Sequence, residues 1–329
     1  MIRQKIRRND LKNSEIYKNT ENLLEKIRSG NKKIIESRRE DIFKKISDIR
    51  DHYQKIAENA ILYSQDATKN DVSAFDELKS TNSMLEDEIR SLLFRNGYPP
   101  DFLEPIYDCK ECCDTGYVSD GNKKLRCRCF LSHASRIIYS LPEYALPGDM
   151  SFSSFDDSLF EGDRMPSIKR TLEKFCNGDI TKHLYIFGKT GTGKTFFLVS
   201  MARLLNDNRV PSLYINSNNL FRITQEYKAS QFSEQKADPF LYSYIYASKV
   251  LLIDDLGTEA ITPSKYSELL EIITQRLRTE RSTIIASNLS PIDLKKMYDE
   301  RIYSRIIGSF DNIKLPGDDL RIILKRRGR

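Results

Sequence analysis

The 329-residue chain is predicted to have an α/β fold, in which a parallel sheet is flanked by helices and preceded by an N-terminal helical region and a small cysteine-rich segment. Three observations indicate this organisation. Residues 1–98 contain no proline and carry apolar residues at helical spacing. Five of the six cysteines lie between Cys109 and Cys129. After residue 150, short apolar runs alternate with helical stretches, which favours a parallel sheet covered by helices.

The N-terminal region is predicted to form two or three antiparallel helices that bury apolar seams against each other. One seam has residues spaced alternately four and three apart, as on one side of a helix: Ile42, Ile46, Ile49, Tyr53, Ile56, Ala60 and Tyr63. A second amphipathic stretch runs from about Phe75 to Phe94, with Leu78, Leu85, Ile89 and Leu92 on one face. The pattern leaves two roles open, a bundle that serves its own stability and a docking module for a partner helix.

The charge of the chain is mildly positive and unevenly distributed. The net charge is +6, with 15 Lys and Arg against 8 Asp and Glu in residues 1–50, and 5 against 9 in residues 51–100. The last nine residues hold five basic side chains and no acid, which suits either solubility or contact with phosphate. There is neither an apolar run of the roughly 18 residues that span a membrane nor a signal peptide. We therefore expect a cytoplasmic protein without a membrane partner.

The C-terminal half contains four apolar runs that are predicted to be strands: His183–Phe187, Ser212–Asn216, Val250–Asp254 and Ser282–Ser287. The first run leads into GKTGTGKT, which fits the phosphate-binding loop pattern at every fixed position. The predicted nucleotide contacts are therefore Gly188, Lys189, Thr190, Gly191, Thr192, Gly193, Lys194 and Thr195. The glycines let backbone N–H groups face a phosphate, Lys194 can reach the β- and γ-phosphates, and the Thr195 hydroxyl can bind Mg²⁺.

Two further runs end in polar residues that suit phosphate chemistry. VLLIDDLG ends a predicted central strand in Asp254, expected to hold Mg²⁺, and Asp255, expected to orient or deprotonate the attacking water. Asp255 is one methylene shorter than the Glu often found there, so hydrolysis that is weak or depends on a partner is one expectation. STIIASN ends in Asn288, expected beside Asp254 and within reach of the γ-phosphate or the water.

Three arginines are candidates for phosphate contacts. Arg301 and Arg305 lie four residues apart in DERIYSRIIGSF, and therefore on one face of a helix. Arg305 is the stronger candidate for a side chain supplied to the nucleotide of a neighbouring subunit. Arg321 in GDDLRI is a candidate phosphate sensor within its own subunit. Ordinary surface positions remain the alternative for all three.

The cysteines have the spacing of a structural metal site. Cys109-x₂-Cys112 and Cys127-x-Cys129 form two pairs, and each pair can hold one side of a tetrahedral Zn²⁺. Four thiolates would leave no open position for catalysis. His133 or Cys113 can replace one ligand, and buried free thiols are the alternative interpretation. Cys176 lies outside the cluster and is expected in the core.

The order of these motifs resembles the AAA+ ATPases of the bacterial DnaC/DnaI-type helicase loaders, within the IstB/DnaC-like family. The resemblance covers about residues 150–329 and rests on the segments GKTGTGKT, VLLIDDLG, IIASN, YSRIIG and GDDLR. The segment CKECCDTGYV…CRC is also similar to one found in that family, except that Cys113 is an extra thiol.

The sequence predicts three domains, because Pro99-Pro100 ends the helical region and a linker with Pro142 and Pro147 follows the cysteines: residues 1–98, 99–149 and 150–329. The resemblance implies that they are a helical helicase-interaction region, a zinc-binding segment and linker, and an AAA+ P-loop ATPase domain. It implies a loader of the replicative DnaB-type helicase onto single-stranded DNA that uses ATP, Mg²⁺ and Zn²⁺ and forms homo-oligomers through its ATPase domains. Two alternatives stay open, an IstB-like transposition helper ATPase and a zinc-stabilised adaptor that binds nucleotide without hydrolysing it.

Overall fold

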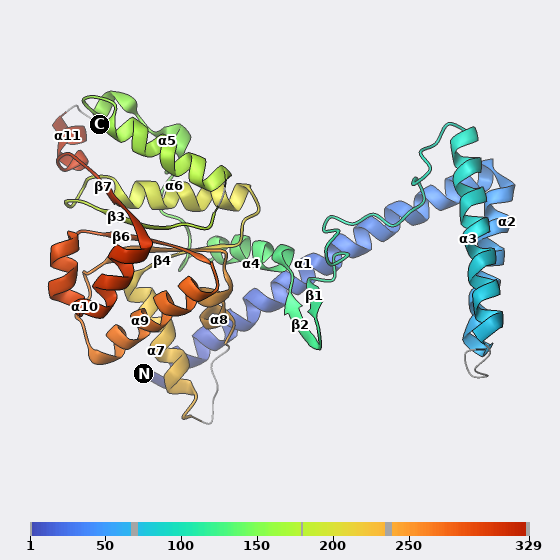
Figure 1. Ribbon diagram of the computed structural model, residues 1–329, viewed down its shortest axis with the longest axis horizontal. Coiled ribbons are helices and arrows are strands. Elements are labelled where there is room, and N and C mark those ends of the chain that lie inside the picture. Colours follow the sequence, from blue (N-terminus) through green and yellow to red (C-terminus); the bar gives the residue numbers. More distant parts are fainter. Residues whose placement is uncertain (1, 67–71, 179, 234–238, 327–329) are drawn as a thin grey trace. The chain divides into compact units, whose positions relative to one another are not determined.

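The computed structural model describes residues 2–66, 72–178, 180–233 and 239–326 (Figure 1). The chain divides into two compact units, one of residues 1–23 with 116–329 and the other of residues 24–115. Among the described residues, no helix combines the length and the apolar character needed to cross a membrane. The predicted division into residues 1–98, 99–149 and 150–329 stays a prediction.

The larger unit is built on a five-stranded parallel sheet, as predicted. Its strands are β3 (His183–Phe187), β4 (Ser212–Asn216), β5 (Val250–Leu256), β6 (Ser282–Ser287) and β7 (Phe310–Lys314). The strands lie in the order β4-β5-β6-β3-β7, and every pair is parallel. Three of the four strands predicted from apolar runs have the predicted bounds, and β5 is two residues longer. The predicted fold class is therefore confirmed.

Helices cover both faces of this sheet (Figure 1). On one side lie α5 (Arg164–Asn177) and α6 (Lys194–Asp207). On the other lie α7 (Ser217–Ser230), α8 (Phe240–Ala247), α9 (Pro263–Arg278) and α10 (Pro291–Ser309). Three of these helices begin at capping side chains that accept a backbone N–H: Asn216, Thr262 and Ser290. The chain also forms two short 3₁₀ turns, Phe152–Ser154 and Asp157–Leu159, and a final helix α11 (Leu320–Arg326).

The core between sheet and helices is apolar and closely packed. It contains side chains of α6 and of the central strands with less than 6% exposure, among them Phe197, Leu198, Leu252 and Ile284. The predicted core residue Cys176 lies in this cluster. Because the central strands are covered on both faces, they have continuous apolar sequences, and this is the pattern that made them predictable.

Helix α4 (Arg128–Ser140) covers the free edge of β4, which is an edge strand. The backbone N–H of Ser212 donates to the Ser135 hydroxyl at 3.0 Å, and that of Tyr214 donates to the Tyr139 hydroxyl at 3.0 Å. Four helical residues rise about 6 Å and two strand residues rise about 6.6 Å, so the two pairs match in spacing. The edge is thereby protected from pairing with another chain.

The second unit contains a helical hairpin of α2 (Ser47–Asp66) and α3 (Val72–Arg95), which lie side by side in Figure 1. Its core consists of Ile42, Ile49, Ile89, Leu93 and Leu103. The predicted seam is not on one continuous helix, because α1 (Ile2–Lys45) ends before Ile46 and α2 begins at Ser47. Ser and Asp side chains favour helix starts, and Ser47-Asp48 is such a start. The side chains of Tyr63 and Phe75, both in the predicted seams, lie outside the described part.

Candidate nucleotide site and cysteine cluster

The glycines of the predicted phosphate-binding loop have the backbone that the loop requires. Gly191 and Gly193 have φ values of +79° and +94°, in the left-handed region that favours glycine. Gly188 is confined for another reason, since a Cβ there would lie 2.8 Å from the carbonyl oxygen of Leu315. The loop leaves the end of β3 and enters α6 at Lys194, so the first N–H groups of that helix face its concave side.

Lys194 brings a buried cation into this loop. Its Nζ donates to the carbonyl oxygens of Gly188 at 2.9 Å and Lys189 at 2.8 Å. Burial lowers the pKa of Lys194, and the nearby carboxylates of Asp255 and Asp254 oppose that effect. Backbone carbonyls are neutral acceptors, so a bound phosphate would give this ammonium the anionic partner that it lacks in the loop. The Thr192 hydroxyl donates a hydrogen bond to the carbonyl oxygen of Lys189 within the loop. The side chains of Lys189 and Thr190 are exposed.

The two predicted magnesium ligands lie together. Asp254 is buried near the end of β5, and the nearby Thr195 hydroxyl lowers the pKa of its carboxyl. The same carboxylate accepts the Tyr214 hydroxyl at 2.8 Å and the backbone N–H of Asp255 at 3.0 Å. Burial raises the pKa of Asp254, and the hydrogen bond from Tyr214 counters it. A hydroxyl and a carboxylate are the hard oxygen donors that Mg²⁺ selects, so Thr195 and Asp254 fit that ion.

One cavity of about 620 Å³ joins the loop to three of the other predicted site residues. From the loop it is lined by Thr190, Gly191, Gly193, Lys194 and Thr195, and from elsewhere by Asp255, Asn288 and Arg321. Asp255 and Asn288 are exposed at the carboxyl ends of β5 and β6, which are neighbouring strands. The topology thus places residues from three parts of the chain around one space, as the strand-end argument expects.

The apolar wall of this cavity was not predicted from the sequence. It consists of Met150, Phe155, Leu159, Phe160, Met165, Phe196 and Phe197. The rings of Phe155 and Phe160 are stacked, with centroids 5.1 Å apart and planes 11° apart. Aromatic faces beside a phosphate-binding loop suit the base of a nucleotide. The signal available in the sequence is the repeated Phe in SFSSFDDSLF, ahead of β3.

The arginines are divided between two places. Arg321 lines the cavity, and its guanidinium pairs with the carboxylate of Asp319 at 2.7 Å. Arg301 and Arg305 lie on α10 and do not line the described cavity. That helix is interrupted at Asp299, where φ is +73°, and the Asp299 carboxylate accepts the N–H of Arg301 at 2.7 Å. Both arginines therefore belong to a newly started helical segment.

A buried carboxylate, Glu259, ties the segment after Asp255 to two helices. It accepts the backbone N–H of Gly257 at 3.0 Å, lies 2.9 Å from the Ser217 hydroxyl at the start of α7, and accepts the Tyr298 hydroxyl on α10. Burial and this bond raise the pKa of Tyr298, so the phenol stays a donor. No sequence pattern singled out Glu259, because its partners are 39 and 42 residues away.

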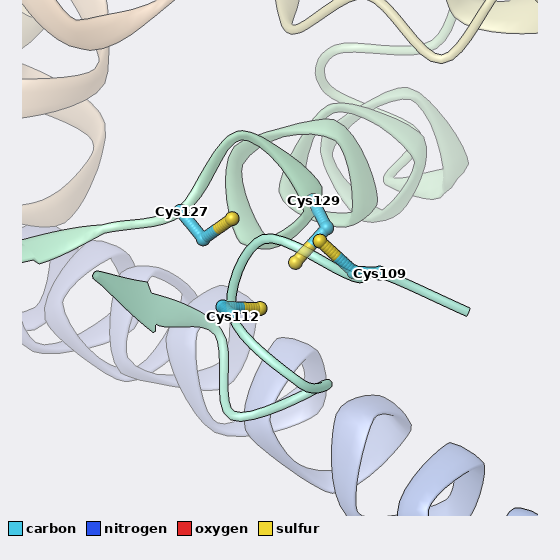
Figure 2. A group of neighbouring side chains, drawn as sticks. All are labelled: Cys109, Cys112, Cys127 and Cys129. Atoms are coloured by element: carbon cyan, nitrogen blue, oxygen red, sulfur yellow. The ribbon is translucent and has the colours of Figure 1, made fainter. Parts of the chain in front are cut away.

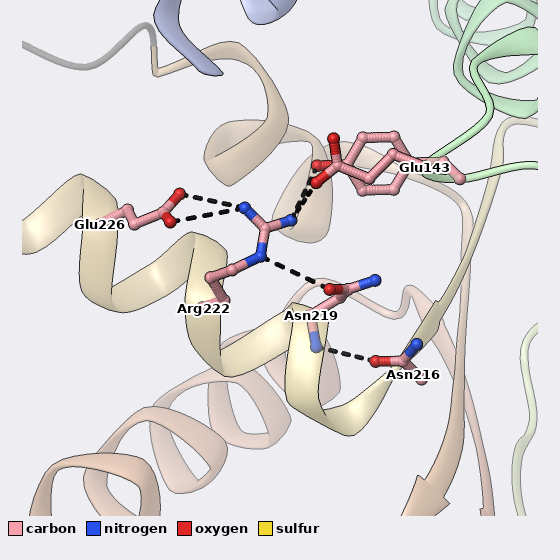
Figure 3. Close-up of polar contacts among 6 residues, drawn as sticks. Glu143, Asn216, Asn219, Arg222 and Glu226 are labelled. Carbon is pink, nitrogen blue, oxygen red and sulfur yellow. Dashed lines mark hydrogen bonds and ion pairs between the residues drawn. The ribbon is translucent and has the colours of Figure 1, made fainter. Parts of the chain in front are cut away.

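A second polar network borders the end of β4 (Figure 3). Asn216, whose register partner on β5 is Asp254, caps α7 by accepting the N–H of Asn219 at 2.8 Å. Further along α7, Arg222 pairs with Glu226 and with Glu143, which lies in the segment after α4. The network therefore fastens α7 to the chain that follows α4.

The four predicted zinc ligands come together (Figure 2). The sulfur atoms of Cys109, Cys112, Cys127 and Cys129 all lie within 4.8 Å of one another. A tetrahedral site with Zn–S bonds of about 2.3 Å has its sulfurs about 3.8 Å apart, so the cluster fits zinc. Cys113 and His133 do not belong to this group of four. Between the pairs the chain forms the hairpin of β1 (Tyr117–Asp120) and β2 (Lys123–Arg126), and Cys127 directly precedes α4.

Asp114 shapes the first half of this cluster. Its buried carboxylate accepts the N–H groups of Cys109 at 2.7 Å and Asp108 at 3.1 Å, and it also accepts the Asn31 amide at 3.2 Å. Because three donors surround the carboxylate, Asp114 fixes the turn that carries Cys109 and Cys112.

Comparisons with known proteins agree with this arrangement. Residues 168–310 match the model of the bacterial DnaA ATPase domain. The chain is 28% identical over 153 residues to the replicative helicase loader DnaI of Bacillus subtilis (strain 168). It carries a DnaA-like ATPase domain and is a homologue of the DnaI helicase loader. The resemblance predicted from the motifs is confirmed.

The extent of these similarities is limited to part of the molecule. The alignment to the Bacillus protein covers 43% of this DnaI homologue and 48% of that loader, about half of its length. The similarity to a solved structure of the DnaC helicase loader spans 54% of this chain and 100% of the DnaC chain, at 20% identity and a TM-score of 0.45. The similarity to a solved structure of DnaI spans 55% of this chain and 94% of the DnaI chain, at 26% identity and a TM-score of 0.42.

Proposed function

We propose that this DnaI homologue is an ATP-dependent helicase loader, which delivers a replicative DnaB-type helicase to single-stranded DNA when replication starts or restarts. The observation that carries the proposal is the cavity in which the phosphate-binding loop meets Asp255, Asn288 and Arg321. It occurs in a chain related to a replicative helicase loader. The proposed ligand is ATP, and the proposed reaction is hydrolysis of its terminal phosphate.

Each residue of the site has a proposed task. The loop N–H groups and Lys194 hold the phosphates, and the apolar wall around Phe155 and Phe160 receives the base. Thr195 and Asp254 hold Mg²⁺, which neutralises charge on the β- and γ-phosphates when bound. Asp255 orients the attacking water and takes its proton, and Asn288 donates to the γ-phosphate or to that water.

The remaining parts have proposed partners. The N-terminal helical region contacts the helicase, and the four cysteines hold a structural Zn²⁺ that stabilises residues 109–129. The ATPase domains associate into a homo-oligomer in which Arg305 of one subunit approaches the nucleotide of the next. Neutralisation of phosphate charge by an arginine from outside the subunit would make hydrolysis depend on assembly.

A second candidate is an adaptor that binds nucleotide without turning it over. The observation that favours it is the position of Asp255, which is exposed, has a φ of +54° and is shorter than a glutamate. Phosphate release that stays at background when helicase and single-stranded DNA are both present would favour this adaptor.

The proposed function is tested by mixing the purified chain with the replicative helicase of the same cell and measuring the mass of the product. A discrete complex whose composition changes when ATP is added is expected. If the two proteins stay separate with and without ATP, the helicase is not the partner, and a transposition helper becomes the better account.

A further inference from the structure

Tyr214 makes two hydrogen bonds in opposite directions. Its side-chain hydroxyl donates to Oδ2 of Asp254 at 2.8 Å. Its backbone N–H donates to the hydroxyl of Tyr139 on α4 at 3.0 Å. One residue of the edge strand β4 therefore touches both the proposed magnesium ligand and the helix that covers the sheet edge. No sequence motif includes Tyr214.

The hydrogen bond to Asp254 settles the orientation of a buried carboxylate. Oδ1 accepts the Asp255 N–H at 3.0 Å, and Oδ2 accepts the Tyr214 hydroxyl at 2.8 Å. Asp254 is only 3% exposed, so water cannot replace a lost partner. A neutral phenol stabilises the anion without adding a positive charge that would repel a metal ion.

The bond to α4 fixes where Tyr214 lies. Ser135 and Tyr139, one turn apart on α4, accept the N–H groups of Ser212 and Tyr214. The Tyr139 hydroxyl also shares a hydrogen bond with the Ser212 hydroxyl, 3.1 Å away. The two bonds set the register of β4 against the helix, and Asn216 at the end of that strand pairs with Asp254. A shift of α4 along the strand would therefore move the Tyr214 hydroxyl relative to Asp254.

We propose that Tyr214 is a positioning residue of the magnesium site, which holds Asp254 for the ion and makes its geometry depend on helix α4. Since Cys127 directly precedes α4, the helix connects the cysteine segment to the nucleotide site. The inference rests on the proposed function, because it assumes that Thr195 and Asp254 serve Mg²⁺-bound nucleotide. It adds a physical route by which events at the cysteine segment alter nucleotide affinity.

The test is the Mg²⁺ concentration that half-saturates binding of a fluorescent ATP analogue to the full chain. Tyr214→Phe keeps the ring and removes only the hydroxyl. We expect the half-saturating Mg²⁺ concentration to rise about 10-fold, the lower end of the effect of losing a partner of a metal ligand. Binding of the analogue in EDTA should stay unchanged. A general loss of packing would instead weaken binding with and without Mg²⁺.

Tyr144→Phe is the matched control, because Tyr144 is also buried and loses only a contact with Arg222, 3.4 Å away. If Tyr214→Phe and Tyr144→Phe have the same half-saturating Mg²⁺ concentration for binding of the analogue, the proposal is wrong. This failure differs from failure of the proposed function, in which the parent chain would not bind the analogue with Mg²⁺ at all.

The dependence on α4 is tested with Tyr139→Phe, which removes the acceptor of the Tyr214 N–H. We expect a rise of about 2- to 5-fold in half-saturating Mg²⁺, smaller because the hydroxyl of Tyr214 is still present. In the Tyr214→Phe background the same change should add nothing, because the link to Asp254 is already cut. Full additivity of the two effects would contradict a route through Tyr214.

Discussion

Lys194 combines burial with a positive charge, and its hydrogen-bond partners among the described residues are carbonyl oxygens. Such an ammonium gains strongly when an anion arrives. We predict that Lys194→Ala weakens ATP binding by about 100-fold, since a charge-assisted contact of this kind contributes up to about 3 kcal/mol. The measurement is a titration with fluorescent ATP. Lys174→Ala, an exposed lysine on α5, is the control. Equal affinities of the two variants would exclude this loop as the phosphate site.

His183 at the start of β3 is a buried ring whose Nδ1 accepts the N–H of Thr283 at 3.2 Å. Burial, and to a smaller extent the charge of Arg276, lower the pKa of His183 to about 4. Unfolding returns the ring to its usual pKa of about 6.5. The unfolded chain therefore binds a proton that the folded chain does not, in the window from pH 6.5 down to 4.

The consequence is a loss of stability as the pH falls through this window. We predict that protonation of His183 in the unfolded chain lowers the free energy of unfolding by about 1–2 kcal/mol at pH 5, after allowance for partial access of solvent to the ring. His183→Asn keeps an acceptor for Thr283 without the titration. The urea unfolding midpoint of the parent should therefore fall relative to that of the variant as the pH falls from 7 to 5. Parallel curves would show that His183 does not titrate in this way.

At the scale of elements, the cysteine segment offers a test with neighbouring residues. Cys112 is buried and one of the four clustered sulfurs, whereas Cys113 is exposed with a φ of +50°. We predict that Cys113→Ser retains one Zn²⁺ per chain and that Cys112→Ser loses it, with faster proteolysis between residues 109 and 129. Metal content and limited proteolysis measure both effects. Retention of zinc by Cys112→Ser together with its loss in Cys113→Ser would reverse the ligand assignment.

The central strands were predictable because each is covered on both faces and has a continuous apolar sequence. β7 was not, because the exposed edge position leaves only Phe310 buried within FDNIK. The break at Ile46 was missed because the apolar spacing continues across it while the backbone does not. Periodicity therefore identifies buried faces, but it does not register a change of direction between two helices that share one core.

The candidate site divides in the same way. The phosphate-binding loop was predictable because its pattern lies within residues 188–195, and the acidic strand end because it directly follows an apolar run. The apolar wall, Tyr214 and Glu259 were not, because their contacts join segments about 30 to 40 residues apart. Hydrogen bonds over such separations leave no spacing pattern in a single sequence.

At the scale of the whole molecule, Arg305 is expected to act on a neighbouring subunit, since it does not line the cavity of its own described chain. We predict that Arg305→Ala binds ATP normally but loses assembly-dependent hydrolysis. Mixing it with Lys194→Ala should restore part of the activity, because one variant supplies the arginine and the other the intact loop.

The measurement is phosphate release by each variant and by their mixture, with helicase and single-stranded DNA present. Arg301→Ala, four residues earlier on the same helix, identifies which arginine acts. A mixture no more active than the sum of its parts would place the role of Arg305 outside the neighbouring site.

The proposed loader is tested most directly by counting helicase molecules retained on closed circles of single-stranded DNA, which have no free end. The full chain with Mg-ATP should raise the retained helicase several-fold over helicase alone. Lys194→Ala should abolish this gain, and Lys174→Ala should preserve it. If the chain with Mg-ATP leaves the amount of helicase on the circles unchanged, the proposed loading function is contradicted.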